Sequence, residues 1–120
     1  MKSNKEVGNI YEDRAVLLLT SNGYKILERN YRVRAGEIDI IAEKCKTIVF
    51  VEVKYRSSSK FGYGIEAVDY RKIRRIYNAA KIYLTLNRKS SYKVRFDCIS
   101  FLGEKVYWTK NLAWGDEIGF

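Results

Sequence analysis

Charged residues inside two apolar, strand-like segments constrain this chain more than any other feature. The segment from Ile48 to Lys54, IVFVEVK, reads as a strand buried on both faces, except for Glu52 and Lys54. Asp39 interrupts a second apolar run, IDII. Burying a charge is costly unless it is paired or bound to a metal ion. The sequence therefore predicts that these charges meet at one site.

A hairpin between the two segments would bring the acids together. If Cys45 and Lys46 form a two-residue turn, Asp39 lies directly opposite Glu52, with Cβ atoms about 4.5–5.5 Å apart. Lys54 then projects from the same face, because side chains alternate along a strand. A shift of one residue would separate the acids onto opposite faces. The turn contains no glycine or asparagine, so this register is a hypothesis.

Two adjacent carboxylates favour a divalent cation. They repel each other unless something positive lies between them. Mg²⁺ prefers oxygen ligands and often uses only one or two carboxylates together with phosphate oxygens. Lys54 would stabilise charge that develops on a phosphate during hydrolysis. The alternative interpretation is a structural ion pair of Lys54 with Asp39 or Glu52 in a half-exposed sheet.

Glu12 is the candidate for a third metal ligand. In the first predicted helix it lies about 60° from the middle of the apolar face, so its side chain can reach the sheet. Asp13 points outward instead. The alternative is that Glu12 is a boundary residue whose carboxylate stays in solvent.

Hydrophobic periodicity predicts a helix, three strands, a second helix and two further strands, with a loop at Ser57–Gly64. This order is typical of an α/β fold with a central mixed β-sheet flanked by helices. The 120 residues fit a single domain, residues 1–120. The predicted helices are Lys5–Ser21 and Val68–Asn87, and the predicted strands are Tyr24–Val33, Glu37–Glu43, Lys46–Tyr55, Tyr92–Leu102 and Lys105–Thr109.

The composition narrows the chemistry. With no histidine in the chain, histidine-based nucleophilic catalysis and most zinc sites are excluded. The net charge of +9 favours a polyanionic partner, of which nucleic acid is the commonest. No apolar run is long enough to cross a membrane, and the N-terminus lacks a signal peptide's apolar core, so we expect a cytoplasmic location. Cys45 and Cys98 are then expected to be ordinary reduced thiols.

Several blocks of the sequence together resemble a known family. They are Gly8–Ala15, Gly23–Asn30, Gly36–Ala42 and Val49–Arg56, and the resemblance extends to Asp97. The chain resembles the YraN-like family of small bacterial proteins. That family is similar to archaeal Holliday junction resolvases and belongs to the restriction-endonuclease-like superfamily. The resemblance implies a restriction-endonuclease-like fold with a D…E-x-K core.

In that core, Asp39, Glu52 and Lys54 match the family's catalytic residues, and Glu12 matches the helix glutamate of the resolvase-like group. The catalytic set is therefore predicted to be Glu12, Asp39, Glu52 and Lys54, with the three acids as metal ligands. Mg²⁺ is the expected cofactor, and Mn²⁺ is expected to substitute for it.

Five basic residues are candidates for holding a phosphate backbone: Arg32, Arg34, Arg56, Lys60 and Lys72. Four of them flank the acidic strands in the sequence, where cations beside aromatic residues suit nucleic acid. Lys72 lies on the apolar side of the second helix and is expected to face the sheet. Solvated surface charge is the leading alternative for each of the first four. Lys72 is equally open to interpretation as a side chain that snorkels past the core edge.

The leading hypothesis is a metal-dependent nuclease that hydrolyses phosphodiester bonds in DNA, including branched or damaged DNA. Activity of the resolvase kind would imply a two-fold homodimer. The competing hypothesis is a non-catalytic nucleic-acid-binding module that retains the nuclease fold. A structural subunit with a protein partner is a third alternative, which the net charge of +9 disfavours.

Overall fold

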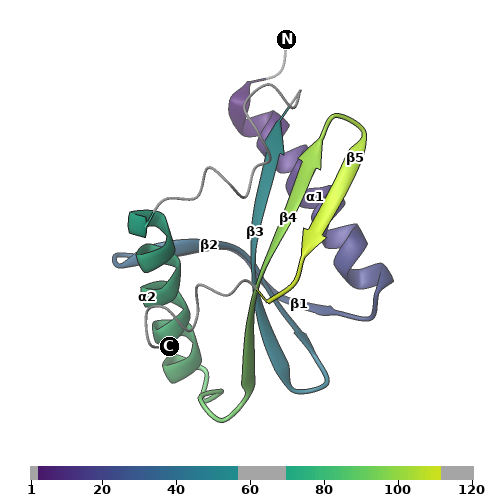
Figure 1. Ribbon diagram of the computed structural model, residues 1–120. Coiled ribbons are helices and arrows are strands. Elements are labelled where there is room, and N and C mark those ends of the chain that lie inside the picture. The colour runs from purple at the N-terminus through teal and green to yellow at the C-terminus, as the bar shows by residue number, and fades with distance from the viewer. Residues whose placement is uncertain (1–2, 57–69, 112–120) are drawn as a thin grey trace.

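The computed structural model describes residues 3–56 and 70–111, and its elements follow the predicted order (Figure 1). The predicted loop Ser57–Gly64, with Lys60, and the start of the second predicted helix lie outside these residues. The helices are α1 (Asn4–Ser21) and α2 (Tyr70–Leu86), and the strands are β1 (Lys25–Val33), β2 (Gly36–Lys44), β3 (Thr47–Arg56), β4 (Lys93–Leu102) and β5 (Lys105–Thr109).

The strands form one mixed sheet in the order β1-β2-β3-β4-β5. Neighbouring strands are antiparallel except β3 and β4, which run parallel because the chain crosses over through α2 between them. Figure 1 shows α2 on one side of the twisted sheet and α1 on the other. This arrangement confirms the α/β fold with a central mixed sheet flanked by helices.

Each face of the sheet has its own apolar core. Phe50 packs with Ile76, Tyr83 and other buried residues on the α2 side. Leu19 and Val51 belong to the cluster on the α1 side. Strand β3 is therefore buried on both faces, as its continuous apolar sequence predicts. Neither described helix is long and apolar enough to cross a membrane.

The β2–β3 turn fixes the register that matters for the site. Cys45 and Lys46 both adopt positive φ angles, 51° and 59°, as a two-residue type I′ turn requires. Ile40 consequently pairs with Val51, and Lys44 pairs with Thr47. This confirms the register predicted from the sequence, although neither turn residue is one that favours positive φ. Cys45 is exposed, Cys98 is buried, and both are free thiols.

Helix α2 approaches β2 closely because Gly36 has no side chain. A Cβ atom at Gly36 would lie 1.9 Å from the carbonyl oxygen of Arg75, which is far inside van der Waals contact. The first turns of α2 therefore rest almost directly on the start of β2. This contact sets the position of the helix end that carries Lys72.

Candidate functional site

Asp39 lies where the pairing between β2 and β3 ends. The continuous β2–β3 ladder runs from Lys44–Thr47 to Ile40–Val51. Beyond it, the Asp39 carboxylate accepts the backbone N–H of Val53 at 2.8 Å. Asp39 thus holds the two strands together by its side chain where the regular ladder stops. The predicted direct pairing of Asp39 with Glu52 is replaced by this side-chain contact with the next residue.

A small pocket opens at this point, between the two strands and the first turns of α2. Its volume is about 180 Å³, and its lining includes Asp39, Glu52, Lys72 and Arg75. The Asp39 and Glu52 side chains both line this pocket and are close enough for the Glu52 charge to raise the pKa of Asp39. The two acids therefore meet at one pocket, as the sequence predicted.

Burial and the neighbouring Glu52 charge raise the pKa of Asp39 to about 8, far above its ordinary value near 3.8. The hydrogen bond from Val53 opposes this shift, and the charge of Glu12 adds to it. The folded protein therefore favours the protonated form of the Asp39 carboxyl, which lessens its repulsion by Glu52.

Two lysines surround the Glu52 carboxylate. Lys54 Nζ lies 3.9 Å from Glu52 Oε1, and Lys72 Nζ forms an ion pair with the same oxygen. Burial and the positive charge of Lys72 lower the pKa of Lys54. Burial also lowers the pKa of Lys72, but the charge and hydrogen bond of Glu52 outweigh it and raise the pKa overall. The structure therefore brings Asp39, Glu52, Lys54 and Lys72 together.

Glu12 approaches the same region from α1, but it is held by other partners. Its Oε1 accepts a hydrogen bond from Asn30 at 3.1 Å and lies 3.7 Å from Arg29. Asn30 lies in β1 between the residues that pair with Ile40 and Ile38, and it has a φ of 52°, a conformation that asparagine tolerates better than most residues. Sequence reasoning missed Asn30, whose only signal was an amide inside a strand pattern.

The donor set at Asp39 and Glu52 fits a hard divalent cation. Both side chains offer oxygen atoms, and a cation between them would offset the burial and the Glu52 charge that raise the pKa of Asp39. Within residues 3–56 and 70–111, no group of three or more potential ligands is placed to hold a metal ion. The structure thus brings Asp39 and Glu52 together at the pocket, while the Glu12 carboxylate contacts Asn30 and Arg29.

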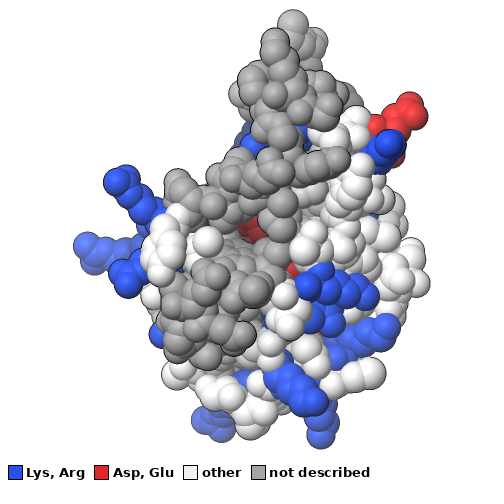
Figure 2. Space-filling model, in the orientation of Figure 1, with Lys and Arg blue, Asp and Glu red and all other residues white. Residues whose placement is uncertain are grey.

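The other predicted phosphate-binding residues lie at varying distances from the pocket. Arg32 is exposed and pairs with Glu37, a pocket residue, at 3.2 Å. Arg34 is exposed in the turn between β1 and β2, and Arg56 is half-buried at the end of β3. In Figure 2, basic side chains project along α2 at the left and gather at the lower right.

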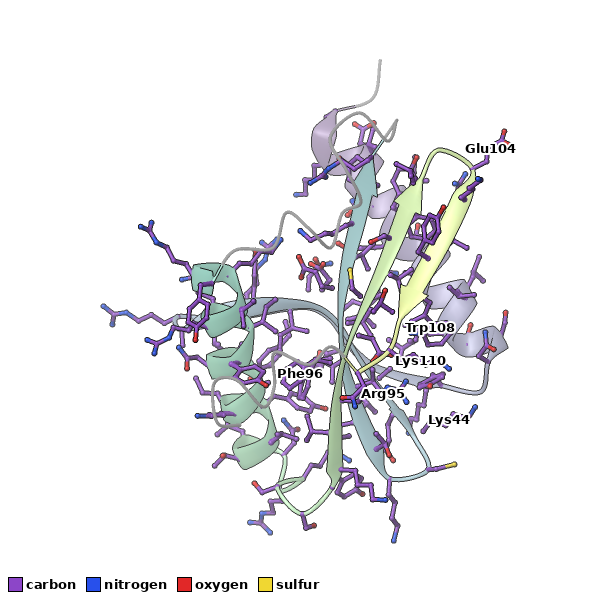
Figure 3. All side chains as sticks on the ribbon, in the orientation of Figure 1. Lys44, Arg95, Phe96, Glu104, Trp108 and Lys110 are labelled. Atoms are coloured by element: carbon purple, nitrogen blue, oxygen red, sulfur yellow. The ribbon has the colours of Figure 1, made fainter. Side chains whose placement is uncertain are left out.

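A second buried acid lies on the opposite face of the sheet. In Figure 3, Phe96 points toward α2 and Arg95 points away from it. Asp97, next along β4, accepts two hydrogen bonds from Arg95, one from Trp108 Nε1 and one from the Asn111 amide. Because these four bonds satisfy its carboxylate, Asp97 fixes the end of β5 to the sheet and is separate from the pocket.

Comparison with known sequences identifies related proteins. The family described as "Uncharacterised protein family UPF0102" matches residues 11–101. A UPF0102 protein of Fusobacterium nucleatum subsp. nucleatum is 56% identical over 118 residues, which cover 98% of this chain and 99% of that protein. A UPF0102 protein of Clostridioides difficile is 48% identical over 104 residues, or 86% of this chain and 91% of that protein.

Comparison with solved structures identifies a shared fold. The structure of Archaeoglobus fulgidus Hjc, a Holliday junction resolvase, matches with a TM-score of 0.60 and 15% sequence identity. The match covers 87% of this chain and 74% of that chain. It confirms the restriction-endonuclease-like fold predicted from the sequence.

Proposed function

This chain belongs to the UPF0102 family, and we propose that it is a single-domain, metal-dependent nuclease that hydrolyses phosphodiester bonds in DNA, including branched or damaged DNA. The observation that carries this proposal is the pairing of Asp39 with Glu52 in one pocket, beside Lys54. A fold shared with a Holliday junction resolvase and a net charge of +9 support it.

Each residue of the pocket has a distinct task in this proposal. Asp39 and Glu52 would hold a divalent cation, Mg²⁺ or Mn²⁺, which when bound would supply Lewis-acid activation of water and phosphate. Val53 donates its N–H to Asp39 and thereby fixes the carboxylate in place. Lys54, 9% exposed, stabilises negative charge on the phosphate in the transition state. Glu12 would add negative charge to the cation site from α1, since its charge already acts on Asp39.

A second candidate function is a nucleic-acid-binding module without catalysis. The ion pair between Lys72 and Glu52 favours it, because an ammonium group already neutralises the carboxylate. A cluster of buried acids facing a polyanion nevertheless favours the enzyme, since binding alone gains nothing from negative charge. The two functions differ in one measurable property, cleavage.

The test is cleavage of a nucleic-acid panel by purified protein with Mg²⁺ or Mn²⁺. The panel contains single-stranded, duplex and four-way-branched DNA, and matching RNA. We expect cleavage of at least one DNA substrate, and a loss of about 10²–10³ in rate for Lys54→Ala. Glu52→Ala should also abolish cleavage and weaken metal binding, while DNA binding persists. Glu104→Ala, at an exposed residue of the β4–β5 turn, is the matched control and should cleave normally.

Three outcomes bear on the proposal. DNA binding without cleavage under either metal would favour the binding module. Absence of both binding and cleavage at low salt would remove nucleic acid as the partner. Cleavage at the wild-type rate by both site variants would identify the activity as a contaminant.

A further inference from the structure

The Glu52 carboxylate has two lysine neighbours that differ in origin and accessibility. Lys54 comes from the same strand, and its side chain is 9% exposed. Lys72 comes from the first turn of α2, and its side chain is 45% exposed. Lys72 makes the closer contact with Glu52 and yet is far more open to solvent. Glu52 therefore has one enclosed lysine and one solvent-exposed lysine beside it.

The surroundings of Lys54 are fixed by the sheet. In the parallel pairing of β3 with β4, Glu52 aligns with Cys98 and Lys54 aligns with Ser100. Cys98 and Ser100 are buried, so the Lys54 stem has little room to move. Lys72 instead reaches the pocket across the gap between α2 and β3, on a flexible four-carbon stem.

Positive charge is crowded around this one carboxylate. The charge of Lys72 is among the causes that lower the pKa of Lys54. A divalent cation on Glu52 would add a third positive group within a few ångströms. The ammonium that leaves at least cost is the exposed one, because water can solvate it as it departs.

We propose that Lys72 is the exchangeable counter-cation of Glu52. In the metal-free protein Lys72 neutralises the carboxylate; when a divalent cation binds, Lys72 leaves Glu52 and becomes available to a substrate phosphate. This inference rests on the proposed function. It makes metal binding and DNA binding positively coupled, because each event favours the same position of Lys72.

The first test is a calorimetric Mg²⁺ titration of the wild type, Lys72→Gln and Arg75→Gln without nucleic acid. Lys72→Gln removes the competitor for Glu52, so we expect Mg²⁺ to bind about tenfold more tightly. Arg75 lines the same pocket with an exposed side chain and is the matched control for a loss of charge. Arg75→Gln should change the affinity by less than about twofold.

The outcomes separate this inference from the proposed function. If the wild type and both variants bind neither Mg²⁺ nor Mn²⁺, the proposed function fails and the inference fails with it. If the wild type binds metal but Lys72→Gln gains no affinity, or Arg75→Gln gains as much, the exchange is wrong while the proposed function stands. Lys72→Ala, which suits a helix, gives a second measurement, and circular dichroism checks the fold of each variant.

The second test measures DNA affinity with and without Ca²⁺, which also takes oxygen ligands. Ca²⁺ should raise the affinity of the wild type, and Lys72→Gln should lose most of that increase. Arg75→Gln should weaken binding by the same factor in both conditions. If Lys72→Gln lowers the DNA affinity by the same factor with and without Ca²⁺, Lys72 contacts phosphate permanently and the proposed exchange is wrong.

Discussion

Replacing Asp39 with asparagine should stabilise the metal-free protein at neutral pH. The pKa of Asp39 is raised to about 8 by burial and by Glu52, so the folded state favours the protonated carboxyl. In the unfolded chain this carboxyl is ionised above its ordinary value near 3.8. Folding at pH 7 must therefore bind a proton. Asparagine avoids that cost and still offers an oxygen to the Val53 N–H and an amide to Glu52.

The size of the effect follows from the pKa difference. When the pKa of a group is higher in the folded protein than in the unfolded chain, the group's stabilising contribution is complete at a pH below the pKa of the unfolded chain. That contribution is lost as the pH rises to the pKa of the folded protein. For Asp39 the loss runs from about pH 4 to about pH 8 and reaches at most about 4 kcal/mol at pH 7. Partial hydration of the half-buried carboxyl reduces the expected gain to about 2 kcal/mol, or about 5–10 °C in Tm.

The assay is urea and thermal unfolding of the wild type and Asp39→Asn in EDTA, between pH 4 and pH 9. The difference in free energy of unfolding should be near zero at pH 4, grow with pH and level off above pH 8. Glu37→Gln is the control, because Glu37 lines the same pocket but is exposed and paired with Arg32. A difference between Asp39→Asn and wild type that is independent of pH, or a less stable variant at pH 8, would refute the reasoning.

Two further predictions concern the backbone that positions the site. Gly36→Ala should destabilise the protein by about 1–3 kcal/mol in urea unfolding, because the new Cβ collides with the Arg75 carbonyl. Gly8 has open space around it in α1, so the control Gly8→Ala should be neutral or stabilising. Replacing Cys45 with asparagine and Lys46 with glycine should stabilise the β2–β3 hairpin by about 1 kcal/mol in the same assay, since both positions have positive φ; a loss of stability would contradict this assignment of the turn.

The elements and the hairpin register could be predicted because local patterns determine them. Apolar periodicity separates helices from strands, and the two charges of β3 show which face must meet Asp39. The residues of the turn, Cys45 and Lys46, do not favour positive φ, so their identity does not predict a turn. The turn was predictable only because it brings Asp39 opposite Glu52. The observed ladder extends from that turn to Ile40 and Val51.

The details of the site depend on long-range packing and were not predictable. The end of the ladder at Asp39 arises from the bond to Val53, which a strand pattern does not reveal. The contacts of the Glu12 carboxylate with Asn30 and Arg29 arise from the packing of α1 on β1, which the sequence does not reveal. The proximity of Lys72 to Glu52 was suggested by the helical wheel, but the ion pair depends on how closely α2 approaches Gly36.

The most direct test of the proposed site is a crystal structure of the protein grown with Mn²⁺ and measured at a wavelength where manganese scatters anomalously. We predict an anomalous peak within bonding distance of both Asp39 and Glu52, and its loss in Glu52→Ala crystals. Helix α2 should then present Lys72 away from Glu52. A peak elsewhere on the molecule, or no peak at saturating Mn²⁺ with Lys72 still paired to Glu52, would contradict the account.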